Sequence, residues 1–262
     1  MRVASAQFNA SISKDENLKR ILHYIEVASK FKVDLIVFPE YSMFFPIKES
    51  SLKLSEPVNG PFINEICNAA RNFGINVVVN FSESSISHNG RVYDTSVLIS
   101  SFGEILSIYR KIHLFDAFNV RESKYILPGN DFTKPITIGD FNVGLLICYD
   151  IRFPEATRTL TLDGCTLLCV SSAWYSGVLK ETHLLTMLLA RAIENGIFIV
   201  MANQTQPTFC GRSCIIDPYG VILADAGESE GIIFTDIDIK RLEDVRSRLP
   251  QLNQRKPKIY RL

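Results

Sequence analysis

The stretch Gly144-Leu-Leu-Ile-Cys-Tyr-Asp-Ile-Arg-Phe-Pro-Glu155 joins the end of an apolar run to a short polar segment and a proline. Residues 141–147 are mostly apolar over a strand-sized length, which predicts a buried strand. Pro154 fits the first turn of a helix, where its missing N–H costs nothing, so a helix is predicted from Pro154 to about Leu162. The chain is therefore expected to pass from a strand through a sharp bend into a helix, with Cys148 on the bend.

The same alternation of strand-like and helix-like segments continues over the whole chain. Ser13 and Glu16 form a capping-box pattern that predicts the start of a helix, and Asn89-Gly90 is a turn signal. Further helices are expected at 62–73, 180–194 and from about residue 239. Further strands are expected at 3–8, 34–38, 76–81, 92–99, 105–110, 166–171, 197–202, 212–216, 221–225 and 232–237.

The order of these elements predicts one α/β domain that spans residues 1–262. No linker or low-complexity segment divides the chain, and the strand–helix–strand order of the first half returns over residues 141–202, which suggests two layered halves. Residues 113–135 have no clean period and contain Pro128-Gly129. We expect an ordered loop over a functional site there.

Composition excludes several classes of protein. The 262 residues are 47% hydrophobic and 21% charged, as in globular proteins, and 28 Lys+Arg balance 28 Asp+Glu. Zero net charge gives no electrostatic reason to expect a nucleic acid or membrane partner, and no apolar run approaches the ~18 residues of a membrane span. A cytoplasmic protein with six reduced cysteines is expected, because no signal-peptide pattern is present. The basic residues of the C-terminal tail are expected in solvent or in a subunit contact: Arg255, Lys256, Lys258 and Arg261.

Three polar residues lie at predicted strand ends, where layered α/β folds place catalytic groups. Cys148 is either a buried structural cysteine or a nucleophile; on the bend, the helix N-terminus is expected to lower its pKa and to supply oxyanion donors. Glu40 and Lys111 could each be simple solvated loop residues. Together the three offer the nucleophile, the proton-transfer group and the cation that amide hydrolysis requires.

The segments around these residues resemble the signature motifs of the nitrilase superfamily, the carbon–nitrogen hydrolases. They are Phe38-Pro-Glu-Tyr-Ser42, Tyr109-Arg-Lys-Ile-His-Leu114 and Ile147-Cys-Tyr-Asp-Ile-Arg-Phe-Pro-Glu155, with further matches at Ala190-Arg-Ala-Ile-Glu-Asn-Gly196 and Gly211-Arg-Ser-Cys-Ile-Ile-Asp-Pro-Tyr-Gly220. The resemblance spans about residues 1–240. It implies a four-layer αββα sandwich that pairs as a homodimer or a higher even-numbered oligomer.

The resemblance also implies roles for single residues. Cys148 is the expected nucleophile, which forms a thioester and releases ammonia, and Glu40 the expected general base and acid. Lys111 and the backbone N–H of Tyr149 are expected to stabilise the tetrahedral intermediate. Glu122 matches a second active-site glutamate, the alternative being a surface loop carboxylate. No metal or cofactor is expected, since the mechanism uses side chains alone.

The substrate inference depends on three residues near the bend. Arg152 is expected either to bind a substrate carboxylate or to form an ion pair with Asp150 or Glu155, and Trp174 and Tyr175 either to line the pocket or to fill the core. The motif around Cys148 is most similar to the Nit-like and ω-amidase branch. A small carboxylate-bearing amide is therefore the expected substrate, and an N-carbamoyl amino acid hydrolase or a nitrilase is the alternative.

Hypotheses of other classes remain open from the sequence. The protein could be non-catalytic or a thiol redox sensor, although Cys165 and Cys169 lie in or beside an apolar strand. A Cys/His pair with His113 or His183 lacks its local signature, and Cys210 with Cys214 lacks a histidine at zinc-finger spacing. Helix 180–194 has more apolar residues than one core-facing stripe needs, which favours an oligomer: Leu184, Leu185, Met187, Leu188 and Leu189.

Overall fold

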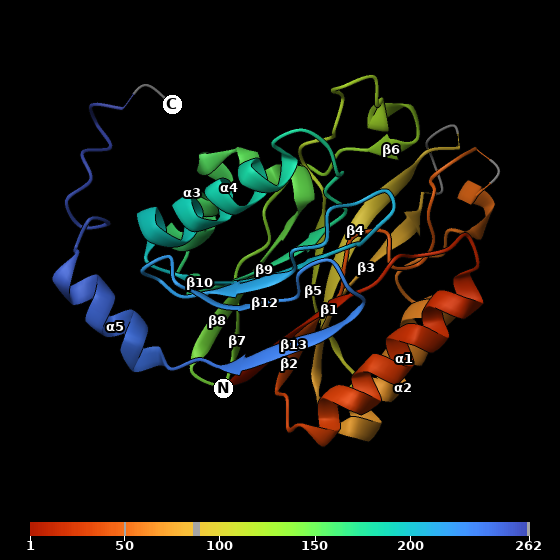
Figure 1. Ribbon diagram of the computed structural model, residues 1–262, viewed down its shortest axis with the longest axis horizontal. Helices are drawn as coiled ribbons and strands as arrows, with labels where there is room; N and C mark the ends of the chain where they lie inside the picture. The colour runs from red at the N-terminus through yellow and green to blue at the C-terminus, as the bar shows by residue number, and fades with distance from the viewer. Residues whose placement is uncertain (50, 86–89, 261–262) are drawn as a thin grey trace.

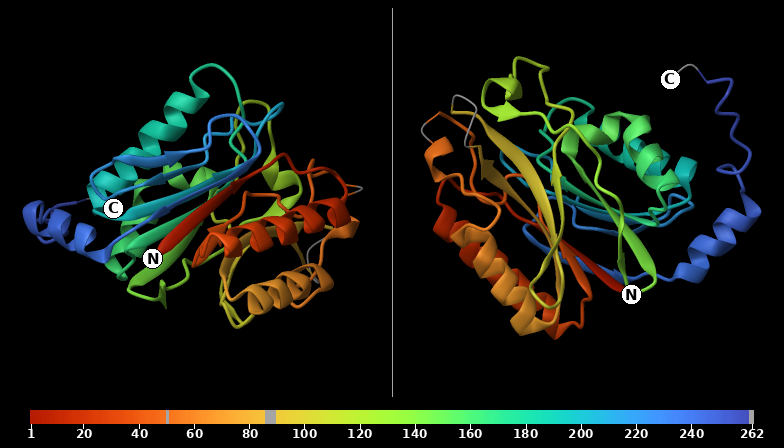
Figure 2. Two further views of the ribbon diagram at one scale, coloured as in Figure 1. Left: turned by 60° about the horizontal axis from the view of Figure 1, so that its bottom comes forward. Right: turned by 180° about the vertical axis from the view of Figure 1, so that it is seen from behind.

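Two β-sheets stacked face to face form the centre of the molecule (Figures 1 and 2). The computed structural model describes residues 1–49, 51–85 and 90–260. In spatial order the first sheet consists of β13 (Gly231–Asp236), β1 (Arg2–Gln7), β2 (Leu35–Val37), β3 (Asn76–Ser84), β4 (Val92–Ile99) and β5 (Ile105–Arg110), with β6 (Ile126–Leu127) paired to β4. The second consists of β12 (Ile222–Asp225), β11 (Cys214–Ile216), β10 (Phe198–Asn203), β9 (Leu167–Ser172), β8 (Phe141–Ile147) and β7 (Ile136–Ile138).

Helices cover the outer face of each sheet, so the predicted four-layer αββα sandwich is confirmed. Figure 1 shows α1 (Lys14–Lys30) and α2 (Pro61–Phe73) on the first sheet and α3 (Pro154–Leu162) and α4 (Lys180–Asn195) on the second. The remaining helix, α5 (Ile239–Arg248), lies at the margin of the sandwich (Figure 1). Three 3₁₀ segments complete the described elements: η1 (Ser51–Leu54), η2 (Glu122–Lys124) and η3 (Cys148–Arg152).

The predicted helix boundaries are confirmed at α1 and α2. The Ser13 side chain accepts a hydrogen bond from the Glu16 backbone N–H at the start of α1, as the capping pattern requires. Pro61 stands in the first turn of α2, and Gly74 ends that helix in the left-handed conformation. Local sequence signals therefore determine both helices of the outer layer on the first sheet.

Each central strand is buried on both faces, because one face meets the other sheet and the other meets helices. Leu35 and Val37 of β2 belong to the core between the sheets, whereas Ile36 belongs to the core under α1 and α2. The period-2 alternation of a strand thus divides an uninterrupted apolar run between two cores. This explains why the predicted strands were apolar without a polar face.

The sequence missed three features of the fold. β7 was not predicted, β3 extends beyond residue 81 to Ser84, and the loop 113–135 contains η2 and the two-residue strand β6. β6 and β7 are too short to show a period, and each exists because it pairs with a distant or longer strand, β4 or β8. The predicted turn at Asn89-Gly90 and the tail residue Arg261 include positions outside the described residues.

Strand direction brings the candidate residues to one edge of the sandwich. β2 and β3 are parallel, and β5 runs the same way because two antiparallel pairings separate it from β3. In the second sheet β8 and β9 are parallel. The Glu40 backbone N–H, just after β2, donates to the Ser172 carbonyl at the end of β9, which joins the carboxyl ends of the two sheets.

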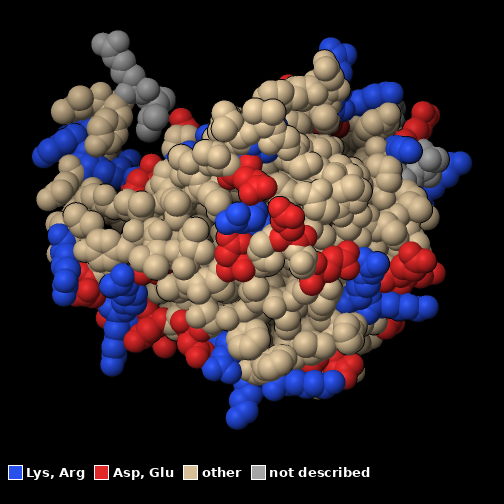
Figure 3. Space-filling view, in the orientation of Figure 1, with Lys and Arg blue, Asp and Glu red and all other residues tan. Residues whose placement is uncertain are grey.

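On the face shown in Figure 3, lysine and arginine side chains are interspersed with aspartate and glutamate. Among the described residues, no helix is both long enough and apolar enough to cross a lipid bilayer.

Candidate active site

A cavity of about 200 Å³ opens at the edge where the carboxyl ends of the strands meet. Its lining includes every side chain that the sequence proposed for the site: Glu40, Lys111, Glu122, Cys148, Tyr149, Arg152, Trp174 and Tyr175. The cavity also touches the loop 113–135 at Phe115, Val120, Arg121, Tyr125 and Ile126. The expectation that this loop lies over the site is confirmed.

Cys148 lies on the sharp bend that the sequence predicts. Its backbone φ is +42°, a left-handed conformation that is uncommon for a residue with a side chain. Asp150 holds the bend closed, because its carboxylate accepts hydrogen bonds from the Ile147 backbone N–H at 3.0 Å and from the Tyr109 hydroxyl at 2.7 Å. The strain at Cys148 is thus supported by a buried acceptor two residues away.

The prediction of a lowered thiol pKa at Cys148 is wrong. Burial raises the pKa of this thiol well above its usual range, and Glu40 raises it further; Lys111, Ser172 and Ala173 only partly oppose the rise. The expected helix dipole is weak at the sulfur because the α-helix begins only at Pro154, six positions further along the chain. A thiol with such a raised pKa is uncharged near neutral pH, and it could act as a nucleophile only with the help of a base.

Glu40 is positioned to be that base. Its side chain is 1% exposed, and its two oxygens have different partners: Oε1 lies 2.6 Å from the Lys111 Nζ, and Oε2 accepts a 2.7 Å hydrogen bond from the Ala173 backbone N–H. Gln204 fixes the Glu40 backbone, since its Nε2 donates to the Glu40 carbonyl at 2.7 Å. These bonds from both sheets leave the carboxylate little freedom to turn.

Glu122 belongs to the same cluster, and the surface-carboxylate alternative is wrong. The residue is only 7% exposed. One carboxylate oxygen lies 2.8 Å from the Lys111 Nζ and also accepts from the Tyr41 hydroxyl, while the other accepts a 2.5 Å hydrogen bond from the Phe115 backbone N–H. Glu122 thereby connects the loop 113–135 to the lysine.

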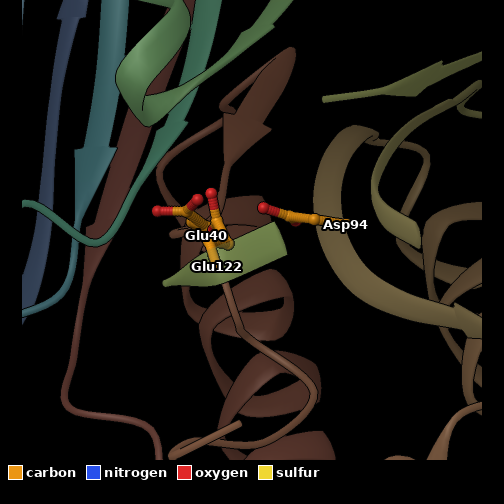
Figure 4. Close-up of side chains that lie close together, drawn as sticks. All are labelled: Glu40, Asp94 and Glu122. Carbon is orange, nitrogen blue, oxygen red and sulfur yellow. The ribbon is translucent and has the colours of Figure 1, made fainter. Parts of the chain in front are cut away.

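Asp94 is a buried member of the cluster that the sequence did not suggest. It lies on β4, and Figure 4 shows its carboxyl pointing toward those of Glu40 and Glu122. Its Oδ1 accepts from the Asn80 Nδ2 at 2.6 Å, and its Oδ2 lies 3.6 Å from the Lys111 Nζ. One signal was available: Asp94 shares a strand face with Leu98, which points into the core between the sheets, so a charge there needed a buried partner.

The cluster contains one ammonium group and three carboxyl groups. Burial raises the pKa of Asp94 well above its usual range, with Glu40 and Glu122 adding to the rise and Lys111 opposing it. Burial alone would lower the pKa of Lys111, but Glu122, Glu40 and Asp94 outweigh it and raise that pKa well above its ordinary value. Lys111 is therefore held as a cation among acids that compete for it.

Glu40, Asp94 and Glu122 could in principle hold a metal ion, since they offer oxygens within 4.8 Å of one another. The Lys111 ammonium lies among these oxygens, at 2.6 Å from Glu40 and 2.8 Å from Glu122. A divalent ion would have to displace a buried lysine that already compensates the negative charge. The donor set therefore favours a lysine-centred cluster.

Arg152 lies against aromatic rings. The alternative of an ion pair between Arg152 and Asp150 or Glu155 is wrong. The Arg152 guanidinium lies 4.4 Å from the Trp174 ring centroid, and among the described residues it has no ion pair with Asp150 or Glu155. Asp150 is instead occupied inside the bend. Trp174 and Tyr175 both line the cavity, so their side chains form part of its wall.

The geometry disfavours the other uses of histidine and cysteine. His113 stacks on Phe153, with ring centroids 3.7 Å apart, and its Nδ1 lies 2.7 Å from Asp150 rather than on the cavity lining. His183 is exposed on α4. Burial raises the pKa of Cys210 to about 12, and neither Cys210 nor Cys214 belongs to a cluster of potential metal ligands among the described residues.

Comparisons with known proteins identify a matching family model, similar sequences and similar structures. The family model described as carbon–nitrogen hydrolase matches residues 2–247. A deaminated glutathione amidase from Escherichia coli O157:H7 is 31% identical over 258 residues, which is 98% of this chain and 97% of that protein. The crystal structure of the Caenorhabditis elegans NitFhit protein matches with a TM-score of 0.91 at 26% identity; the match covers 99% of this chain and 66% of NitFhit. An amidase from Nesterenkonia sp. AN1, solved with acrylamide added at its active-site cysteine, matches with a TM-score of 0.79 at 25% identity over 96% of this chain and 98% of that chain.

Proposed function

Because the chain belongs to the carbon–nitrogen hydrolase family and is a cysteine-dependent amidohydrolase, we propose that it hydrolyses a small amide that carries a carboxylate. One observation supports this substrate class above others. Arg152 lines the same cavity as Cys148, Glu40 and Lys111, rests on the Trp174 ring, and has no acidic partner among the described residues. A guanidinium with free donors in an active-site cavity is suited to a carboxylate.

The proposed reaction begins with proton transfer from Cys148 to Glu40. The thiolate sulfur attacks the amide carbonyl carbon, and the Lys111 ammonium and the Tyr149 backbone N–H stabilise the oxyanion. Glu40 then protonates the amide nitrogen, and the C–N bond breaks. Ammonia departs, and the acyl group remains on the Cys148 sulfur as a thioester. Glu40 next removes a proton from a water molecule, which hydrolyses the thioester and releases the carboxylic acid with the thiol restored.

Glu122 is proposed as the residue that orients Lys111 and the loop. Its two oxygens bind the ammonium and the Phe115 backbone N–H at once. Loss of this bridge would therefore disturb both the oxyanion cation and the cavity wall. Asp94, on β4, lies 3.6 Å from the Lys111 Nζ and is the third carboxyl group around it.

The names of the relatives extend the proposal to a substrate. Two full-length relatives, from Escherichia coli O157:H7 and mouse, are named deaminated glutathione amidase, and the mouse protein is 32% identical over 98% of this chain. Deaminated glutathione contains both amide bonds and carboxylates. We therefore include it with simple carboxylate-bearing amides in the proposed substrate class.

A substrate panel tests the proposed function. The purified chain is incubated with amides that carry a carboxylate, their neutral analogues, N-carbamoyl amino acids, nitriles and deaminated glutathione. The released acid is measured together with the released ammonia or, for deaminated glutathione, whose amides are secondary, the released amine. Carboxylate-bearing amides are expected to give the highest kcat/KM. Preference for nitriles or N-carbamoyl amino acids would instead support the alternative activities.

Replacing Arg152 by lysine should weaken the selection of carboxylate-bearing substrates. Lysine keeps the charge but cannot make the planar two-point contact, so these substrates should lose about 1.5–3 kcal/mol of transition-state binding relative to neutral analogues. The measurement is the ratio of kcat/KM for an acid amide to that for its neutral analogue. An unchanged ratio would remove the support for a carboxylate contact at Arg152.

Exhaustive chelation is expected to leave activity unchanged. The proposed chemistry uses Cys148, Glu40 and Lys111, and the lysine already compensates the carboxyl cluster. Ammonia release is compared before and after dialysis against a strong chelator, with metal content measured in both samples. Loss of activity that a divalent metal alone restores would contradict the proposed mechanism.

A redox-sensing role is the alternative of another class, and the thiols do not favour it. Reactive sensor cysteines have low pKa values, whereas burial raises the pKa of Cys148, of Cys165 (to about 12) and of Cys169. All six cysteines are free and buried. This state supports the proposal that the protein works in a reducing compartment such as the cytoplasm.

We expect a homodimer or a higher even-numbered oligomer formed through the face of α4. Leu185 and Leu189 are only partly buried there, and Ile193, one turn further on the same face, is 44% exposed beside the turn at Gly220. Light scattering should give at least twice the 29.5 kDa of one chain. Ile193→Glu should shift the protein toward the monomer, whereas Phe73→Glu on α2, across the sandwich, should not.

A further inference from the structure

Three cations on the cavity wall, Arg121, Arg152 and Lys180, have no ion pair among the described residues. Arg121 is exposed on the loop 113–135, whereas Arg152 and Lys180 are partly buried and contact aromatic rings. The remaining cation on the lining, Lys111, is buried and surrounded by carboxyl groups. Arg152 and Lys180 are both partly exposed, whereas Lys111 is 1% exposed, so they form the outer part of the cavity and Lys111 the inner part. The inner end of the cavity therefore holds carboxyl groups that are already paired with Lys111. Its outer end holds cations that are not paired with carboxyl groups.

Aromatic rings hold both cations in place. The Arg152 guanidinium lies 4.4 Å from the Trp174 ring centroid and 5.8 Å from that of Tyr149. The Lys180 ammonium lies 3.7 Å from the Phe118 ring centroid and 5.7 Å from that of Phe115. A cation that rests on a ring face is oriented without using its N–H donors on a carboxylate, so those donors stay available to a ligand.

Trp174 connects the two cations. Its ring face supports Arg152, and its Nε1–H donates a 2.9 Å hydrogen bond to the backbone carbonyl of Lys180 at the start of α4. The indole thus fixes the backbone position of one cation relative to the side chain of the other. Trp174 therefore contacts both cation-bearing residues.

We propose that Arg152 and Lys180 form a two-cation site that binds the carboxylate of the amide substrate, and that Lys180 is a specificity-determining residue. This inference rests on the proposed amidase function and adds Lys180 to it. The ligand is an amide whose free carboxylate lies at the far end of the molecule from the scissile bond, because the cations lie in the outer part of the cavity. Arg152 supplies the planar pair of donors and Lys180 a point charge.

The electrostatics of the unliganded site agree with this assignment. Burial lowers the pKa of Lys180, and the neighbouring Arg152 guanidinium lowers it further; burial also lowers the pKa of Arg152. Two like charges held close together destabilise each other, and an anion between them relieves the repulsion. The repulsion between Arg152 and Lys180 raises the free energy of the empty site, and a bound carboxylate lowers it.

The test measures selectivity with isosteric probes. Glutaramate and its neutral diamide, glutaramide, differ in charge and hardly in shape, and kcat/KM is measured for both in the wild type, Lys180→Met and Lys180→Arg. The glutaramate-to-glutaramide ratio should fall by about 10- to 100-fold in Lys180→Met and by less in Lys180→Arg. Lys240→Met removes the same charge from α5, outside the cavity lining, and should leave the ratio at the wild-type value.

A purely structural role for Lys180 predicts another result. If the side chain only holds Phe118 in place, Lys180→Met should lower kcat/KM for both probes together and leave their ratio within about twofold of the wild type. That outcome would overturn the proposal. A wild-type enzyme that does not distinguish the two probes would overturn it as well.

A binding measurement separates this inference from the proposed function. The binding of succinamate, glutaramate and adipamate to the Cys148→Ala variant is measured by calorimetry, with and without Lys180→Met. If the wild type hydrolyses no amide but the variant pair shows carboxylate binding that Lys180→Met weakens about 10-fold or more, the proposed function fails and the two-cation site stands. If none of the three compounds binds, or if Lys180→Met binds them equally well, the two-cation site is wrong.

Discussion

Cys148→Ala should lower kcat/KM for any amide substrate by at least about 10³-fold, because loss of a catalytic nucleophile typically removes that much. The thiol points into the cavity beside Glu40 and Lys111, and its raised pKa makes it dependent on a base rather than already reactive. Ammonia release under saturating and limiting substrate gives the effect directly. Folding is checked by the thermal midpoint, which should move by only a few degrees.

Cys67→Ala is the matched control for this variant. It also removes a buried thiol, but from the outer helix α2, away from the cavity lining. It should retain activity within about twofold of the wild type. If Cys148→Ala stays within tenfold of the wild type while it folds normally, another residue must be the nucleophile.

Lys111→Met should abolish turnover and also destabilise the protein. The methionine has similar length but no charge, so the oxyanion loses its cation and the carboxyl groups of Glu40, Glu122 and Asp94 face one another without compensation. Breaking a buried ion cluster by removal of one partner typically costs about 3–5 kcal/mol. Denaturant unfolding at neutral pH measures the loss, and ammonia release measures the catalytic defect, expected to exceed about 10²-fold.

The stability defect of Lys111→Met should depend on pH in a defined direction. Lys111 lowers the pKa of Asp94, so its removal should raise further a pKa that burial has already raised. A carboxyl group with a higher pKa in the folded than in the unfolded state binds more protons when folded, so stability falls as pH rises from the unfolded value of about 3.9 through the folded value. The deficit should therefore shrink at acid pH and grow toward neutral pH.

Lys30→Met provides the comparison for the lysine variant. Lys30 pairs with Glu26 on the exposed surface of α1, where solvent screens the ion pair and leaves it little weight in stability. Its effect on unfolding should be small and its effect on turnover absent. A Lys111→Met protein as stable as Lys30→Met at neutral pH would mean that the carboxyl cluster does not depend on its lysine.

Motifs with local causes could be predicted from the sequence. The bend at Cys148 follows from an apolar strand that meets a proline-initiated helix, and α2 follows from Pro61 and Gly74. Glu40 and Lys111 could be placed at strand ends because each apolar run stops just before them. These inferences needed only neighbours in the chain.

Features that depend on distant contacts could not be predicted in the same way. Asp94 enters the site because β4 pairs between β3 and β5, which sets its face toward Lys111. The prediction for the thiol pKa of Cys148 has the wrong direction because the local helix geometry carries no information on burial by distant segments, which is the largest cause of the raised pKa. Lys180 has no motif, and contacts with Trp174, Phe115 and Phe118, which are distant or non-periodic in the sequence, place it at the cavity.

The position of Trp174 also means that the intrinsic tryptophan fluorescence of the protein depends on the surroundings of the cavity. Trp174 is the only tryptophan of the chain, and its indole lies on the cavity wall between a guanidinium and the start of α4. The emission excited selectively from this one fluorophore therefore comes from the substrate pocket alone. Occupation of the cavity will change the quenching of that emission, so pocket filling can be followed in real time without any label.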